Sequence, residues 1–290
     1  MDAVSDDQAI SVRGLRKSYG RTTAVAGVDL WVRRGEIFAL LGPNGAGKTT
    51  TVEILEGFRR RDSGEVRVLG VDPAVGGRSW RSRIGIVLQG TGEFDELTVA
   101  EVVGQFARFY PRPDDPEAVI ARVGLAEKAG ARTHSLSGGQ KRRLDVALGV
   151  VGRPELVFLD EPTTGFDPQA RRGFWTLIRD LAAGGTTILL TTHYLEEAEA
   201  LADRVGVIAN GKLVAVAPPE DLGDRARQPA TVTWRTPQGQ VESRLTATPT
   251  ALVTELAAGA ADGEVPGLAV TRPTLEDIYL TMIGERETAA

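Results

Sequence analysis

Short runs of apolar residues alternate with amphipathic stretches over most of the chain. The apolar runs are residues 36–41, 84–88, 156–160, 187–192 and 205–209. Runs of this length and texture are typical of strands buried on both faces of a parallel sheet. Helical periodicity lies between them, at residues 98–110, 114–123, 137–151, 168–183 and 195–203. This alternation predicts an α/β fold with a mainly parallel sheet.

The pattern changes after Leu213, where two polar and proline-containing stretches, AVAPPEDLG and GDRARQPA, indicate a boundary. The alternating runs TVTWR and VESRL then flank a five-residue turn and predict a hairpin. A helix is expected near residues 250–258, and Thr274 to Asp277 has the spacing of a capping box. We therefore expect a large domain over residues 1–220, with a helical part at about 90–153, and a small α+β domain over residues 221–290.

Composition narrows the class of protein. The chain has 290 residues, 42% of them hydrophobic and 25% charged, which is typical of a globular protein. A net charge of −5 argues against a dedicated nucleic-acid-binding protein. The absence of cysteine excludes a disulfide scaffold, thiol catalysis and cysteine-ligated metals. No run approaches the ~20 apolar residues of a membrane helix, and the acidic N-terminus does not match a signal peptide, so we expect a cytoplasmic protein.

A phosphate-binding loop follows the first buried apolar run. The motif G-x-x-x-x-G-K-[ST] is matched by Gly42, Pro43, Asn44, Gly45, Ala46, Gly47, Lys48 and Thr49, and Thr50 continues into a helix. Glycines let backbone N–H groups surround an anion, and the helix N-terminus adds a partial positive charge. We expect Lys48 between the β- and γ-phosphates of a nucleotide and the Thr49 hydroxyl on Mg²⁺. A glycine-rich turn with a surface lysine is the weaker alternative, because both flanks fit the motif.

Two carboxylates end the strand at residues 156–160. Asp160 is expected to hold Mg²⁺ through water, and Glu161 is expected to polarise the attacking water as a general base. The alternative is an acidic strand end exposed to solvent. The phosphate loop upstream favours the catalytic interpretation.

A second candidate anion site begins the helix at residues 137–151. Ser137 is a natural N-cap, and Gly138 and Gly139, followed by Gln140, leave backbone amides exposed. The three cations Lys141 to Arg143 follow, where the helix dipole disfavours positive charge by ~0.3–1 kcal/mol. A bound phosphate would offset this cost, so we interpret the helix start as an anion site.

These elements resemble the nucleotide-binding subunits of ATP-binding-cassette (ABC) transporters, whose signature is LSGGQ between a phosphate loop and an acidic strand end. The resemblance covers residues 10–220. It implies that Tyr19 stacks on adenine, that Gln89 links Mg²⁺ and water to a membrane subunit, that Asp167 belongs to a dimer-contact loop, and that His193 contacts the γ-phosphate. It further implies that ATP bound to the phosphate loop of one subunit is covered by Ser137, Gly138 and Gly139 of another in a head-to-tail dimer.

Two further segments resemble export ATPases of the daunorubicin and multidrug-resistance class, although they are less specific than the motifs above. These segments are residues 193–204 with 210–214, and residues 273–282. They imply export of a hydrophobic drug, antibiotic or lipid-like compound through a separate transmembrane permease. The resemblance places the chain on the cytoplasmic side of the membrane and residues 89–110 against the permease. The alternatives are an importer ATPase and a DNA- or ribosome-acting ABC ATPase. Clusters of basic residues in the sequence favour the DNA- or ribosome-acting class only weakly.

Overall fold

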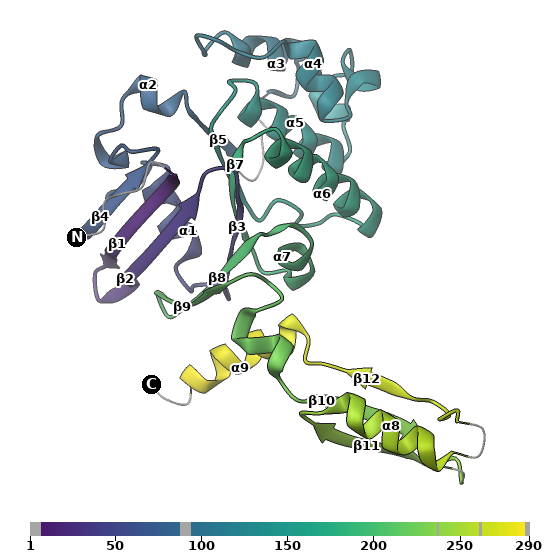
Figure 1. The fold of residues 1–290 in the computed structure, drawn as a ribbon. Helices are drawn as coiled ribbons and strands as arrows, with labels where there is room; N and C mark the ends of the chain where they lie inside the picture. The colour runs from purple at the N-terminus through teal and green to yellow at the C-terminus, as the bar shows by residue number, and fades with distance from the viewer. Residues whose placement is uncertain (1–6, 88–93, 237, 261–262, 288–290) are drawn as a thin grey trace. The chain divides into compact units, whose positions relative to one another are not determined.

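The computed structural model describes residues 7–87, 94–236, 238–260 and 263–287, and Figure 1 shows their fold. The chain divides into two compact units, Met1–Val216 and Ala217–Ala290. This division lies four residues before the boundary expected from sequence and falls at the last residue of the strand Lys212–Ala217. No helix of the described part is both long and apolar enough to cross a bilayer.

The first unit contains a six-stranded sheet in the order β5-β6-β7-β3-β8-β9. Its strands are β3 (Ile37–Leu41), β5 (Ile84–Val87), β6 (Leu156–Asp160), β7 (Thr187–Thr192), β8 (Arg204–Ala209) and β9 (Lys212–Ala217). The pairs from β5 through to β8 are all parallel. All five residues of β3 are buried, as a strand covered on both faces requires. The predicted α/β class with a mainly parallel sheet is confirmed.

A second, antiparallel sheet lies in the same unit, with the order β2-β1-β4. It is formed by β1 (Gln8–Tyr19), β2 (Thr22–Arg33) and β4 (Ser63–Val68). One hydrophobic core joins the two sheets: Leu15 and Val66 of the antiparallel sheet belong to the same cluster as Phe38 and Phe158 of the parallel sheet. The antiparallel sheet is therefore packed on the same core as the strand that precedes the phosphate loop.

Seven α-helices of the first unit lie in the described residues. They are α1 (Lys48–Leu55), α2 (Arg78–Arg81), α3 (Val99–Ala107), α4 (Pro116–Arg122), α5 (Gly138–Val150), α6 (Pro168–Ala183) and α7 (Leu195–Leu201), with 3-10 turns at Pro73–Val75, Ala126–Lys128 and Thr133–Ser135. Helices α3, α4 and α5 pack on one another. Their starts are set by side-chain caps, since Thr98 and Ser137 each complete a capping box and Asp115 accepts a bond from the N–H of Ala118.

The second unit is a small α+β structure. Strands β10 (Ala230–Arg235), β11 (Val241–Thr246) and β12 (Ala269–Thr271) form an antiparallel sheet in the order β11-β10-β12. Helix α8 (Pro249–Gly259) packs on β10, where Val232, Trp234 and Leu252 form a small core. Helix α9 (Leu275–Glu287) packs on the 3-10 turns at Leu222–Arg227, and Thr274 and Asp277 form the expected reciprocal cap.

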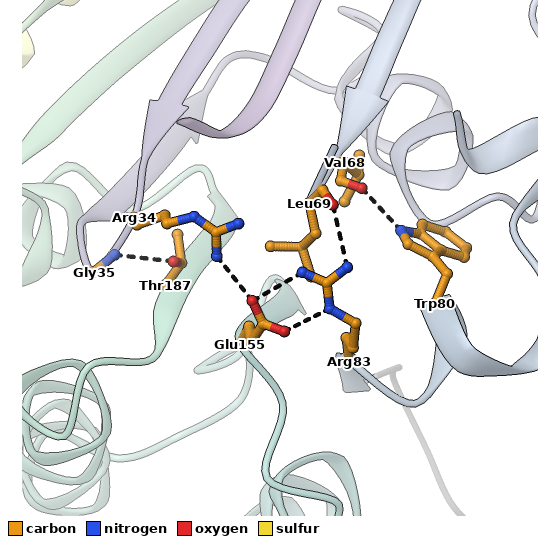
Figure 2. Close-up of polar contacts among 8 residues, drawn as sticks. All are labelled: Arg34, Gly35, Val68, Leu69, Trp80, Arg83, Glu155 and Thr187. Carbon is orange, nitrogen blue, oxygen red and sulfur yellow. Dashed lines mark hydrogen bonds and ion pairs between the residues drawn. The ribbon is translucent and has the colours of Figure 1, made fainter. Parts of the chain in front are cut away.

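Figure 2 shows a polar network at the edge of the parallel sheet where β5, β6 and β7 begin. The carboxylate of Glu155 accepts hydrogen bonds from Arg34 at 2.8 Å and from Nη2 of Arg83 at 3.0 Å. The Arg83 guanidinium also donates to the carbonyl of Leu69, just after β4. The Thr187 hydroxyl accepts from the N–H of Gly35 at 2.9 Å. The network thus ties the beginnings of these strands to the antiparallel sheet.

Glu155→Gln is expected to lower the free energy of unfolding by at most about 1 kcal/mol at neutral pH, because this carboxylate is 42% exposed and solvent screens its partners. Hydrogen bonds from Arg83, and then from Arg34, lower the pKa of Glu155. The stabilisation is therefore present above the unfolded pKa of about 4.5 and lost as pH falls through the lower folded pKa. Urea denaturation at about pH 7 and about pH 3 measures this difference.

The matched control for that measurement is Glu127→Gln, which neutralises an exposed carboxylate in the helical part. We expect no change in the urea midpoint for this variant at either pH. A Glu155→Gln variant whose stability relative to the wild type is the same at both pH values would show that the charge of Glu155 contributes nothing to folding.

Candidate functional site

The loop between β3 and α1 has a shape that only glycine permits at two positions. Gly47 has φ +103°, and a Cβ there would lie 2.3 Å from the carbonyl oxygen of Ala24 in β2. A Cβ on Gly42 would lie 2.4 Å from the carbonyl oxygen of Ile208 in β8. The turn between β8 and β9 holds the loop from a third side, since the N–H of Gly211 donates to the carbonyl of Ala46 at 3.0 Å. The backbone is therefore packed closely against both sheets.

Lys48 lies inside this loop. Its side chain is buried, and Nζ donates to the carbonyl oxygens of Gly42 at 2.7 Å and Pro43 at 3.1 Å. Burial lowers the pKa of Lys48, whereas the charges of Glu161 and Asp160 oppose this shift. The loop thus surrounds a desolvated cation that lies near two carboxylates, while Thr49 is exposed. Such an arrangement of a cation and a helix N-terminus fits a phosphate ligand.

The carboxyl ends of β6 and β7 bring three of the expected site residues together. The Thr191 hydroxyl donates to the Asp160 carboxylate. Glu161 has the left-handed φ of +42°, and its N–H donates to the carbonyl of Thr191 at 3.1 Å. Nδ1 of His193 lies 3.2 Å from the Glu161 carboxylate, and both side chains are partly exposed. A carboxylate beside a histidine in this position can accept a proton from a water.

The donor set fits a magnesium ion. Mg²⁺ prefers oxygen ligands and usually takes only one or two from the protein, the others coming from water and substrate phosphates. Asp160 and Thr49 offer a carboxylate and a hydroxyl, and the described residues contain no cluster of three or more acidic or histidine ligands.

Burial, together with the charges of Asp160 and Glu53, raises the pKa of Glu56 to about 8, so another carboxyl group near this site is mostly neutral at pH 7.

The LSGGQ segment begins α5 with an accessible N-terminus. Oγ of Ser137 accepts from the N–H of Gln140 at 3.3 Å, and Oε1 of Gln140 accepts from the N–H of Ser137 at 3.0 Å. A Cβ added to Gly138 would have no neighbour within 4 Å, so the surface there is open. Asp167 caps another helix: its carboxylate accepts from two backbone N–H groups at the start of α6.

The expectation that a bound phosphate offsets all three cations after LSGGQ is wrong for two of them. Arg142 is buried and donates to the carbonyl of Asp160 at 2.9 Å. Arg143 donates to the carbonyl of Val123 at 3.1 Å, and Lys141 is exposed. Backbone carbonyls, rather than a ligand, are the partners shown for these two arginines, of which Arg142 is buried and Arg143 half-buried.

One other expected residue lies away from these contacts. Tyr19 ends β1 and is 42% exposed, with the Arg59 guanidinium 5.2 Å from its ring centroid. Gln89 lies outside the described residues.

Sequence analysis missed three buried polar residues that surround the site: Thr191, Arg142 and Glu197. Glu197 is fully buried and accepts from Nε1 of Trp175 at 3.3 Å, and burial raises its pKa. Thr191 is one of three threonines in β7, and the sequence does not distinguish it from the other two. Arg142 lies within a run of cations, a pattern more typical of a solvated helix face.

Comparisons with known proteins place these features in context. A family model described as ABC transporter matches residues 25–164, an interval that contains the phosphate loop, LSGGQ and Glu161. A daunorubicin resistance ATP-binding protein from Streptomyces coeruleorubidus is 37% identical over 309 residues, covering 96% of this chain and 97% of the relative. A Nod factor export ATP-binding protein from Ralstonia nicotianae is 43% identical over 218 residues, covering 73% of this chain and 68% of the relative.

Among solved structures, one from Clostridium perfringens, described as part of an ABC transporter complex, has 28% sequence identity and a TM-score of 0.70. The match covers 76% of this chain and 92% of that one.

Proposed function

The chain belongs to the ABC transporter family of ATP-binding proteins, and from this premise we propose that it hydrolyses ATP to drive export through a separate membrane permease. We infer the direction of transport from the match to a daunorubicin resistance protein. This match covers 96% of the chain and includes the small C-terminal unit. An importer is not favoured by these relatives. The cargo that fits this class is a hydrophobic drug, antibiotic or lipid-like compound.

ATP is bound in this proposal by the loop from Gly42 to Thr49 and the following Thr50. Lys48 exchanges its two carbonyl partners for phosphate oxygens, and the N-terminus of α1 faces the same charge. Tyr19 stacks on the adenine through its exposed ring. Thr49, Asp160 and Gln89 would hold Mg²⁺, which when bound neutralises charge on the phosphates.

Hydrolysis uses the residues at the ends of β6 and β7. Glu161 accepts a proton from the attacking water, and its position beside His193 at 3.2 Å supports this role. His193 contacts the γ-phosphate and orients the carboxylate. Thr191 holds both Asp160 and the backbone of Glu161, so the two carboxylates keep separate directions.

A dimer completes the site in this proposal. Ser137, Gly138 and Gly139 begin a helix with nothing packed over Gly138 in the described chain, and they would cover the ATP held by a second subunit. Gln140 fixes the helix start through the capping box, and Asp167 fixes the neighbouring contact loop at the start of α6. A homodimer would have two such sites.

An aromatic cluster formed by Phe106 of α3, Phe94 before the helix and Phe109 after it is the proposed contact with the permease. Phe106 packs edge-on against Phe94 at 5.5 Å and against Phe109 at 5.8 Å between ring centroids. Phe109 is 73% exposed and belongs to this cluster of three aromatic rings, which supports an apolar contact here. Contact with a permease at this surface would place the chain at the cytoplasmic face of the membrane.

Co-purification from native membranes tests this function. Tagged Glu161→Gln protein with Mg-ATP is expected to recover a polytopic membrane protein, and the additional change Phe109→Ser is expected to reduce that recovery several-fold. Phe58→Ser is the control, because Phe58 is 79% exposed but lies after α1. Recovery of nucleic acid or ribosomes without a membrane protein would favour the alternative ABC ATPases instead. Equal recovery with Phe109→Ser would exclude the aromatic cluster as the contact.

A further inference from the structure

A buried arginine connects the LSGGQ helix to the catalytic end of β6. Arg142 lies on the second turn of α5 and is 7% exposed. Its Nη2 donates to the carbonyl oxygen of Asp160 at 2.9 Å, and its Nε donates to the carbonyl oxygen of Pro162 at 3.1 Å. Asp145, also buried on α5, lies 3.6 Å from Nη1 and balances the charge.

The two carbonyl groups are those on either side of Glu161. Nε and Nη2 form one edge of the planar guanidinium, so a single side chain holds the backbone before and after this residue. The Glu161 backbone needs such support, because a left-handed φ of +42° is costly for a residue with a Cβ. Thr191 supplies the opposing contact from β7 by accepting the N–H of Glu161 at 3.1 Å. The backbone of Glu161 is therefore held from α5 on one side and from β7 on the other.

We propose that Arg142 is a positioning residue for ATP hydrolysis, fixing the Glu161 carboxylate through the backbone of the segment from Asp160 to Pro162. The inference rests on the proposed role of Glu161 as the base. Because α5 also begins with LSGGQ, any displacement of that helix is transmitted directly to the carbonyls beside Glu161. The hydrogen bonds of Arg142 given above reach the segment that carries the base, rather than the phosphate loop. The loss of Arg142 should therefore change turnover and leave nucleotide affinity intact.

Arg142→Lys is the decisive variant. Lysine keeps the positive charge beside Asp145 but offers one ammonium in place of a rigid edge with two donors. The expected result is a fall in kcat on the order of 10- to 100-fold, because small displacements of a catalytic group have effects of this size. The Kd for ATP should stay within about two-fold. Turnover is measured on the full-length chain in the membrane complex recovered by co-purification, and ATP binding on the purified chain.

The matched control is Arg143→Lys, the neighbouring change on the same helix. Arg143 also donates to a backbone carbonyl, but this carbonyl belongs to Val123 in the helical part and not to the segment around Glu161. We expect Arg143→Lys to lower the melting temperature about as much as Arg142→Lys, without the loss of kcat. If Arg142→Lys does not fold, Arg142→Gln, which keeps one donor, is used in the same way.

A double-mutant cycle separates positioning from general damage. Once Glu161 is replaced by glutamine, the base that Arg142 positions is gone, so Arg142→Lys should slow the Glu161→Gln protein no further. The inference would be overturned if the double variant lost kcat by the product of the two single losses, or if Arg142→Lys kept the wild-type kcat. Equal losses of kcat in Arg142→Lys and Arg143→Lys would do the same. Wild-type turnover in Glu161→Gln alone would instead overturn the proposed function.

Discussion

Glu161→Gln is expected to lower the steady-state turnover of Mg-ATP by about 10²- to 10⁴-fold while ATP still binds. Glutamine has nearly the same shape as glutamate and keeps an oxygen for the Thr164 hydroxyl, which lies 3.4 Å from the carboxylate. Its amide cannot accept a proton from water at neutral pH, so the chemical step alone is lost. Bound ATP then persists, and the proposed ATP-bound dimer should accumulate.

Three measurements check this expectation: phosphate release, equilibrium binding of ATP, and size-exclusion chromatography with and without Mg-ATP. The control is Glu155→Gln, because Glu155 precedes the strand that Glu161 follows, so both variants neutralise a carboxylate at an end of β6. Phosphate release by the control should match the wild type. Wild-type phosphate release in Glu161→Gln would exclude this residue as the base.

Lys48→Ala is expected to weaken ATP binding by about 10- to 100-fold, the effect of removing a charge-assisted bond to a phosphate oxygen. The structure gives a reason for a large effect. The ammonium is already desolvated inside the loop and needs only to exchange the carbonyls of Gly42 and Pro43 for phosphate oxygens. Alanine removes this charge and leaves a buried carbonyl without its donor.

Equilibrium titration with ATP in the presence of Mg²⁺ measures the change. Lys128→Ala, which removes an exposed lysine from the helical part, should bind ATP like the wild type. An unchanged Kd in Lys48→Ala, with the protein folded, would contradict the assignment of the loop from Gly42 to Thr49.

The apolar runs located the strands of the parallel sheet because each is buried on both faces. All residues of β3 and β7 are buried, and both strands lie where the sequence places them. The strand order could not be predicted in the same way. It places β6 beside β7 and thereby brings Glu161 next to His193, a contact between residues far apart in the sequence.

The motifs located the loops and helix starts of the candidate site because those depend on local backbone chemistry. Gly47 needs a positive φ, and Ser137 caps a helix, whatever the rest of the fold does. The direction of long side chains is different, because it depends on which carbonyls lie within reach. Arg142 is therefore indistinguishable from the exposed Lys141 in the sequence, and only its burial and its bond to the end of β6 separate them.

The close packing of the phosphate loop has a thermodynamic consequence. A Cβ on Gly47 would meet Ala24 of β2, a Cβ on Gly42 would meet Ile208 of β8, and Gly211 donates to Ala46 of the loop, so neighbouring backbone confines the loop. Association with ATP then loses little conformational entropy there, and more of the interaction energy remains as affinity. Because the loop backbone is confined in this way, the rate of nucleotide capture should be set by diffusion and charge rather than by folding of the loop.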